Sequence, residues 1–315
     1  MRRCATPKRW RATCSRAHHG ARDVPVGEDL LAHLIRVVDD LDAHRGVCRA
    51  GHSGLSSAGI VDGSDLDDDA RAARDWHHRL HRAVCDTLTP WEYGTVVRAS
   101  GYPNYFDYNA VRVERETPMG FTELAAFADR ALDGLAHRRV DFEVTGPADR
   151  ARADFEAAGW KTMRLLWMRH RSLAPTPAGA VVQVVDYDAV QRLRLAWHRE
   201  DFDYPLTDGS YFVQSRELAL KRGARVLAVL EDGEPIAFAQ LIRMRRAAEI
   251  THVYVAAEHR GRGLGTAITC AAIADAGSGR NLWICADQED RPKELYARLG
   301  FAPVWTTVQF LRVPR

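Results

Sequence analysis

The sequence predicts an α/β (α+β) fold with two units, each a mixed, mostly antiparallel sheet flanked by helices. Three observations support this prediction. Strand-like and helix-like patterns alternate from about residue 72 to the end of the chain. A glycine-rich turn at residues 260–266 joins a β-branched, aromatic segment to an apolar helical one. A helix-like segment that ends in glycine and an aromatic residue occurs twice, at Gly159-Trp160 and at Gly300-Phe301.

Size and composition restrict the class of protein. A chain of 315 residues has room for two domains. Its net charge of +2 is too small to indicate nucleic acid as the main partner. We expect no membrane partner, because no run of about 18 apolar residues occurs, and a cytoplasmic location, because no secretory segment is recognised. The six cysteines form no C-x-x-C pair and match no zinc spacing, so we expect no metal.

The first 71 residues are predicted to be an extension that is largely disordered. Residues 1–22 contain several arginines and no acid, and residues 51–70 are rich in Gly, Ser and Asp, which is typical of a linker. A basic arm is also compatible with contact to nucleic acid. Both interpretations of the arm stay open from the sequence.

Residues 72–172 form the first predicted unit. Leu80, Val84 and Leu88 repeat every four residues, which is typical of a helix. β-branched and aromatic runs predict the strands, and apolar residues at helical spacing predict the later helices. In order, we expect a helix at 74–89, strands at 95–99 and 108–114, a helix at 121–135, a strand at 140–144, a helix at 148–158 and a strand at 161–169.

A Pro/Ala-rich linker, residues 173–179, leads to the second predicted unit, residues 180–315. Asp232-Gly233 indicates a hairpin turn between two strands, and Gly277 ends the helix that follows the glycine-rich turn. In order, we expect a strand at 181–185, helices at 187–201 and 209–222, strands at 226–231, 235–244 and 249–255, a helix at 264–276, a strand at 281–286, a helix at 291–299, and strands at 302–305 and 307–313.

The glycine-rich turn is the strongest functional signal in the sequence. Glycines permit a tight turn and close approach of a ligand to the backbone, and the N-terminus of a helix attracts phosphate. Neither the P-loop nor the dinucleotide fingerprint fits this segment. Arg-x-x-Gly-x-Gly does fit, at Arg260, Gly263 and Gly265. The residues predicted to bind the ligand are Arg260, Gly261, Arg262, Gly263, Leu264, Gly265 and Thr266.

With the later run Leu295-Tyr296-x-x-x-Gly300-Phe301, this turn makes residues 180–315 resemble the GNAT acyltransferase superfamily. The resemblance implies acetyl-CoA as the acyl donor and an amine as the acceptor. It further implies that the backbone N–H groups of Val253 and Val255 contact the donor and that Tyr296 protonates the departing thiolate. Many members carry an asparagine early in the last helical segment; this chain has none between residues 287 and 291.

The first unit resembles a degenerate half of the same family. Where the phosphate loop would stand, it has Glu114 and Glu116, whose charge would repel pyrophosphate. We therefore expect catalysis in the second unit, with the first serving as a scaffold or as part of the acceptor pocket. Whether the chain is a monomer or a homodimer is left open.

Glu249 is the predicted general base. An amine is mostly protonated at neutral pH, so a base must remove a proton before it attacks. Strand alternation places Glu249 with Thr251 and Val253 on one face, and His252 on the other as a packed residue. A carboxylate facing solvent at the start of a strand is the alternative interpretation.

A small cationic amine is the acceptor that the sequence favours. Between the first two helices of the second unit lie acids and aromatic residues that attract a cation. The residues predicted to bind the acceptor are Glu200, Asp201, Asp203 and Tyr204. An ordinary hydrated loop is the alternative for this segment. For the whole protein, the alternative function is a non-catalytic acyl-CoA-binding sensor or regulatory module.

Overall fold

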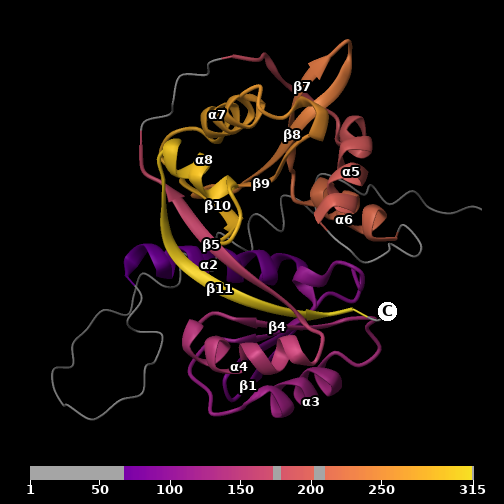
Figure 1. The fold of residues 1–315 in the computed structure, drawn as a ribbon, viewed down its shortest axis with the longest axis vertical. Helices are drawn as coiled ribbons and strands as arrows, with labels where there is room; N and C mark the ends of the chain where they lie inside the picture. Colours follow the sequence, from indigo (N-terminus) through magenta and orange to yellow (C-terminus); the bar gives the residue numbers. More distant parts are fainter. Residues whose placement is uncertain (1–66, 173–178, 202–209, 314–315) are drawn as a thin grey trace, which may run out of the picture.

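The computed structural model describes residues 67–172, 179–201 and 210–313. The predicted extension lies almost entirely outside these residues, as does most of the predicted linker. The part of the chain before residue 173 is called the first half below, and the part after residue 178 the second half. Among the described residues, one 11-stranded sheet runs through both halves, and helices flank it (Figure 1). Along the sheet the strands are β1 (Thr87–Trp91), β2 (Gly94–Arg98), β3 (Ala110–Val113), β4 (Arg138–Phe142), β11 (Phe301–Arg312), β5 (Lys161–His170), β10 (Asn281–Asp287), β9 (Ala247–Val255), β8 (Glu234–Arg243), β7 (Arg225–Glu231) and β6 (Val182–Val185).

The predicted fold class is confirmed: the sheet is mixed and mostly antiparallel. Among the described strands, the parallel neighbours are β3 with β4 and β9 with β10, so each half contributes one parallel pair. The flanking helices are α2 (Asp68–Val84), α3 (Phe121–Ala131), α4 (Thr145–Ala157), α5 (Gln191–Asp201), α6 (Ser210–Lys221), α7 (Leu264–Ala276) and α8 (Pro292–Arg298). The two predicted sheets are thus joined edge to edge into one.

The two halves exchange their last strands. β5, from the first half, lies between β11 and β10, and β11, from the end of the chain, lies between β4 and β5. The sequence predicted two short strands after residue 301, but the structure has one, with a register shift between Pro303 and Trp305. β1 was also missed, because its residues were assigned to the preceding helix. Its Pro90 lies on an edge strand, where a missing N–H donor is tolerated.

Side chains of the exchanged strands complete the cores of both halves. Phe310 of β11 stacks on Phe155 of α4, with ring centroids 4.2 Å apart, and both side chains are fully buried. Met168 of β5 packs in the other direction, into the core beneath α7. Burial of large apolar side chains is the main stabilising contribution to folding. Each half therefore depends on the other for a core strand.

Cutting the chain between residues 172 and 179 is expected to leave the two pieces associated. Hydrogen bonds along β11–β4, β11–β5 and β10–β5 cross the cut, together with the apolar contacts just described. A protease site introduced there, followed by size-exclusion chromatography under native conditions, measures this. Both pieces should elute in one peak at the mass of the intact chain. Two separate folded pieces would contradict the prediction.

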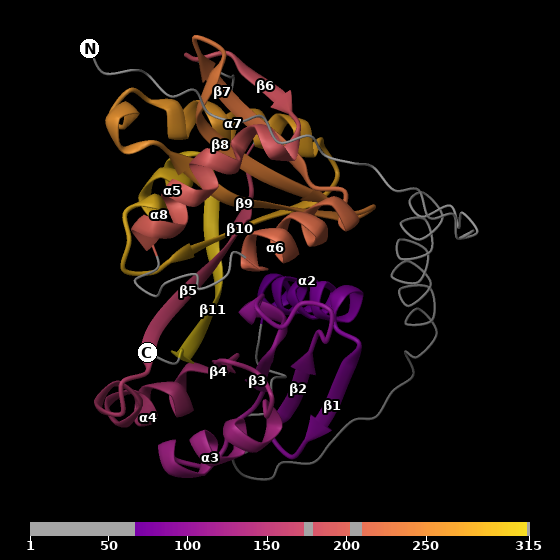
Figure 2. The ribbon, with the colours of Figure 1, turned by 90° about the vertical axis from the view of Figure 1, so that its right-hand side faces the viewer.

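Helix α2 lies between the two halves, against α6 and the first strands (Figure 2). Asp67 caps its start, accepting a hydrogen bond from the backbone N–H of Ala70 at 2.7 Å. Its buried face, including Trp76 and Leu80, packs in one cluster with Trp167 and Trp283. This packing fixes α2 beside the strands of the second half. No helix within residues 67–172, 179–201 and 210–313 combines the length and apolar character needed to span a membrane.

Candidate active site

Strands β9 and β10 separate in the middle of the sheet. They pair in parallel over Ala247–Ile250 and Asn281–Ile284. Beyond these residues β9 remains paired with β8 as far as Val255, while β10 remains paired with β5. A register shift between β8 and β9 accompanies the separation, and His252 there has a φ of +52°. The last residues of β9, which include Val253 and Val255, therefore have no described strand beside them on the β10 side.

We call Val253–Val255, the residues of β9 that have no described strand on the β10 side, the free end of β9. The predicted phosphate loop follows this free end and leads into α7. Gly261 and Gly263 have φ values of +78° and +79°, and Gly263 is the N-cap of the helix. This left-handed conformation is costly for any residue with a Cβ atom. A Cβ atom at either position would meet no atom within 4 Å, so backbone conformation, and not space, requires glycine here. The first N–H groups of α7 are thus presented at its N-terminus.

Both arginines of the loop form ion pairs with carboxylates. Arg260 pairs with Glu200 of α5 and donates from Nε to the carbonyl oxygen of Val255 at 3.0 Å. Arg262 donates to Glu231 Oε1 at 2.7 Å. These side chains are about half exposed, so each pair contributes little to stability. Their guanidinium groups are therefore accessible to a competing anion.

Glu200, a predicted acceptor-binding residue, lies beside the loop. Its carboxylate accepts a hydrogen bond from the hydroxyl of Tyr254 at 2.7 Å, which with Arg260 holds the pKa of Glu200 below its usual value. Asp201 is the last residue of α5, and its side chain is outside the described part. Asp203 and Tyr204 lie outside the described residues.

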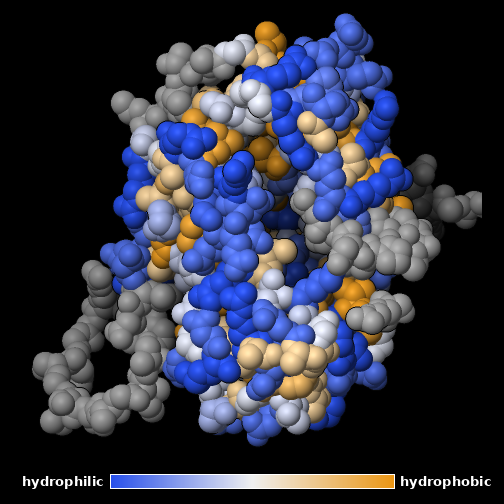
Figure 3. Space-filling model, viewed as in Figure 1, coloured by the Kyte–Doolittle hydropathy of each residue, from blue (hydrophilic) through white to orange (hydrophobic). Residues whose placement is uncertain are grey.

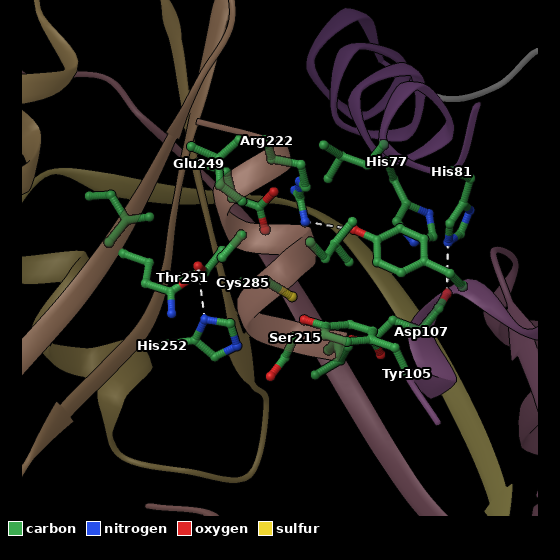
Figure 4. A pocket seen from close by; sticks show the side chains of 18 of the residues that line it. His77, His81, Tyr105, Asp107, Ser215, Arg222, Glu249, Thr251, His252 and Cys285 are labelled. Carbon is green, nitrogen blue, oxygen red and sulfur yellow. Dashed lines mark hydrogen bonds between the residues drawn. The ribbon is translucent and has the colours of Figure 1, made fainter. Parts of the chain in front are cut away.

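A cavity of about 220 Å³ lies between the two halves, next to the separation of β9 and β10. Residues of α2 and of the segment before β3 line one side, and residues of α6, β8 and β9 line the other. Figure 3 shows that the surface is hollowed between the halves in this view, and Figure 4 shows the side chains that point into the cavity. The first half therefore forms one wall of this site.

Glu249 lines this cavity and is 7% exposed, so the solvent-facing alternative is wrong. Its Oε2 atom accepts a hydrogen bond from Trp76 Nε1 of α2 at 2.8 Å. Burial raises the pKa of the carboxyl group, while Arg222 and the Trp76 hydrogen bond act in the opposite direction. A carboxylate with a raised pKa, held in place by a hydrogen bond, has the properties of a general base.

His252 lines the same cavity, which the prediction from strand alternation did not anticipate. The positive φ of this residue interrupts the alternation, so Glu249 and His252 both reach the cavity (Figure 4). The imidazole packs edge-on against Trp197, with ring centroids 5.0 Å apart. Burial lowers the pKa of His252 to about 3, so the ring is neutral near pH 7.

Tyr296 lies on α8, beside β10, and is 5% exposed. Its ring packs edge-on against Phe301, with centroids 6.2 Å apart. Burial, with a smaller contribution from Cys285 of β10, raises the pKa of its hydroxyl well above the usual value. The hydroxyl therefore stays protonated at neutral pH but is a weaker acid than an exposed tyrosine, and Tyr296 is not among the residues that line the cavity.

His77 and His78, which are partly buried, and Glu143, which is buried, form a group whose atoms lie within range of a metal ion. The Glu143 carboxylate already contacts His78 Nε2 at 2.5 Å and Arg74 Nε at 2.6 Å. Burial by itself raises the pKa of Glu143, yet His78, Arg74 and Arg112 lower it to about 2. Two arginines beside the carboxylate disfavour a bound cation. The contacts instead tie α2 to the first half of the sheet.

The comparisons with known proteins agree with this fold. Residues 193–301 match the model of the family described as Acetyltransferase (GNAT) family. This segment of the second half therefore matches a GNAT acetyltransferase domain, and that family uses acetyl-CoA as its acyl donor. No match to the chain was found among curated proteins.

Solved structures with a similar fold include a functionally unknown conserved protein from Staphylococcus epidermidis. It is 15% identical, with a TM-score of 0.58 over 73% of this chain and 95% of that one, a likeness of fold alone. A GCN5-related N-acetyltransferase from Kribbella flavida is 20% identical, with a TM-score of 0.49 over 79% and 97% of the two chains. A tandem GNAT protein from the clavulanic acid biosynthesis pathway is 15% identical, with a TM-score of 0.43 over 79% and 98%.

The sequence left open whether the first half is a scaffold or part of the acceptor pocket, and it did not indicate which residues of that half line the cavity. Trp76, which holds Glu249, lies 173 residues before it in the chain. Arg222 was predicted to end a helix, with no role assigned. The aromatic and histidine content of residues 76–81 and 102–108 was visible in the sequence, but no local pattern relates those segments to Glu249.

Proposed function

We propose that this protein is an acetyl-CoA-dependent N-acetyltransferase that transfers an acyl group to a primary amine by direct attack. One observation carries the proposal: Glu249 is a buried carboxylate that lines a cavity at the separation of β9 and β10. The free end of β9 leads from it to the loop at the start of α7. The acceptor, the acyl group and the pyrophosphate would thus lie one after another along β9 and the loop that follows it.

The loop residues fit a pyrophosphate ligand. Gly261 and Gly263 supply the left-handed backbone, and Leu264, Gly265 and Thr266 supply N–H groups in the first turn of α7. Arg260 and Arg262 add positive charge, and their exposed ion pairs with Glu200 and Glu231 are weak enough to exchange for phosphate.

In the proposed reaction Glu249 accepts one proton from the protonated acceptor amine, whose nitrogen then bonds to the acyl carbon as the carbon–sulfur bond breaks. The nitrogen loses a second proton to give the amide, which replaces the proton that Tyr296 donates. Backbone N–H groups of Val253 or Val255 stabilise the charge that develops on the carbonyl oxygen. Tyr296 gives its proton to the departing thiolate. Trp76 has a positioning role, because it fixes the carboxylate of Glu249.

The acceptor is proposed to enter the cavity between the halves. Asp201, the last residue of α5, and Asp203 and Tyr204 after it remain predicted acceptor contacts. Glu200 has a second proposed role, because its ion pair with Arg260 connects α5 to the phosphate loop.

Release of thiol from acetyl-CoA, measured with and without a panel of small amines, tests this function. We expect release that depends on the amine, with a stoichiometric N-acetyl product detected by mass spectrometry. A non-catalytic acyl-CoA sensor would bind acetyl-CoA, seen as a rise in Tm, but would release no thiol with any amine. That result would reject the proposed transfer while leaving the donor site in place.

A further inference from the structure

Three buried side-chain atoms that can donate a hydrogen bond lie together behind one wall of the cavity. They are Tyr187 Oη, Arg194 Nε and Gln240 Nε2. These residues are at most 5% exposed. Burial raises the pKa of Tyr187, while Arg194, Ser215 and Gln240, which lie close to its hydroxyl, act in the opposite direction. We call Tyr187, Arg194, Ser215 and Gln240 the donor cluster. Tyr187 Oη lies close enough to Ser215 and Gln240 to share hydrogen bonds with them, which leaves Arg194 Nε and the second N–H of Gln240 in need of an acceptor, because buried donors are nearly always paired in proteins.

Arg194 is the charged member of the donor cluster and is fully buried. It donates to Ser215 Oγ at 2.8 Å and to Gln191 Oε1 at 3.3 Å, and its guanidinium lies over the ring of Tyr187, 4.6 Å from the centroid. Among the described residues no carboxylate lies within ion-pairing distance of it. A buried cation without a counter-ion is costly to the fold, which an anionic ligand would relieve.

The donor cluster reaches the cavity that Glu249 lines through two of its four members, and Tyr187 and Arg194 lie behind them. Ser215 and Gln240 line that cavity. Gln240 is paired across the strands with Thr251, two residues from Glu249, so the two side chains are diagonal neighbours on one face of the sheet. A ligand with one group at Glu249 and another at the donor cluster therefore needs only a short connection between them.

Arg222 is a second arginine of this region without an ion pair in the described residues, while in formal charge the carboxylates of Glu249, Asp107 and Asp141 balance the three arginines around the cavity. Arg222 lines the cavity and donates a hydrogen bond to Tyr108 Oη at 2.7 Å. Among the described residues, Arg222 Nε has no hydrogen-bond partner, and no carboxylate lies within ion-pairing distance of the Arg222 guanidinium. Arg139 is balanced, because it pairs with Asp107 and with Asp141. His77, His81 and His252 also line the cavity, and burial keeps all three neutral near pH 7.

We propose that the acceptor is a small amino acid or a similar zwitterion, whose carboxylate binds the donor cluster while its amine faces Glu249. This inference rests on the proposed N-acetyltransferase function and specifies the acceptor. A cavity of about 220 Å³ suits a metabolite smaller than a drug-sized ligand. A diamine would place its second cation beside Arg194 and Arg222, and an amine without an anionic group would leave the donor cluster unpaired.

Matched sets of acceptors test the carboxylate directly. Each set contains an amino acid, its amide and its decarboxylated amine, including α-, β- and γ-amino acids, and kcat/KM is measured from thiol release. We expect the acid to exceed both analogues by at least about 100-fold, because a site built to bind a polar group strongly rejects ligands that lack it. Equal or faster acetylation of the amides or amines would overturn the proposal.

Variants of the donor cluster supply an independent test. Arg194→Met and Gln240→Leu should raise the KM for the preferred amino acid by at least about 10-fold and leave the KM for acetyl-CoA unchanged. Arg192→Met, an exposed arginine on the same helix, is the matched control and should change neither. Because Arg194 is a buried cation with no carboxylate partner among the described residues, its replacement by methionine should not lower Tm. An unchanged acceptor KM in both cluster variants would contradict the carboxylate site.

A binding measurement separates this proposal from the proposed function. Isothermal titration of the intact protein with the same acceptor sets requires no acyl transfer. If no amine is acetylated but the amino acids bind and their amides do not, the anion site stands and the transferase function fails. If acetylation occurs while acids, amides and amines bind alike, the carboxylate site fails and the transferase function stands.

Discussion

Replacing Glu249 by glutamine is expected to lower kcat/KM for amine acetylation by about 100- to 10,000-fold at neutral pH, the usual contribution of a general base. Glutamine has nearly the same shape and its carbonyl oxygen still accepts the hydrogen bond from Trp76, but it cannot take a proton. Binding of acetyl-CoA should be unchanged. Initial rates over a range of amine concentrations, with a separate binding titration of acetyl-CoA, measure the two quantities.

The pH dependence of the wild-type enzyme follows from the same carboxylate. Glu249 must be ionised to act as a base, and burial raises its pKa above the usual value. The acid limb of kcat/KM should therefore rise with pH through that raised pKa and be absent in Glu249→Gln.

The same pKa shift affects stability. Because the folded state holds this proton more tightly than the unfolded chain, Glu249 stabilises the fold at low pH, and this contribution is lost as the pH rises through the folded pKa. At pH 7, Glu249→Gln should consequently not lower Tm.

Glu234→Gln is the control for this substitution, since Glu234 is an exposed glutamate at the start of β8 in the same sheet. It should leave both the rate and its pH dependence as in the wild type. Retention of more than a third of wild-type kcat/KM in Glu249→Gln would mean that another group removes the proton.

The second large effect is expected at Gly263. Acetyl-CoA at about 100 times its Kd should stabilise the wild-type protein by roughly 2.7 kcal/mol, a shift of several degrees in Tm. Gly263→Glu should abolish this shift. A side chain at φ +79° strains the N-cap of α7, and a carboxylate at a helix N-terminus occupies the place proposed for phosphate.

Gly279→Glu distinguishes loss of binding from loss of stability. Gly279 lies in the turn after α7 and has a φ of +84°. As at Gly263, a Cβ atom at this position would meet no atom within 4 Å. The two variants thus carry the same charge and similar backbone strain at opposite ends of one helix. Both should have a lower Tm than the wild type, but Gly279→Glu should keep its response to acetyl-CoA. A full response in Gly263→Glu would place the donor elsewhere.

The sequence determined the parts of this protein that depend on local patterns. Glycines at 261 and 263, between a β-branched strand and an apolar helix, were sufficient to predict a tight turn at the start of α7, and the predicted range of α7 agrees with the structure. The periodicity of residues 225–255 predicted three successive strands, which the structure confirms. These features follow from backbone conformation and from apolar spacing within a few residues.

Tertiary structure decided where the strands pair and which side chains meet. β5 and β11 have ordinary strand patterns, and nothing in either sequence states that each completes the other half, because pairing is set by contacts more than 100 residues apart. The hydrogen bond from Trp76 to Glu249 and the buried, unpaired charge of Arg194 arise in the same way. His252 is the local counterpart: a single left-handed residue overrides strand alternation and turns its ring into the cavity. The sequence therefore specified the glycine-rich loop proposed to bind the donor, whereas the cavity proposed to bind the acceptor exists only because two distant halves of the chain pack together.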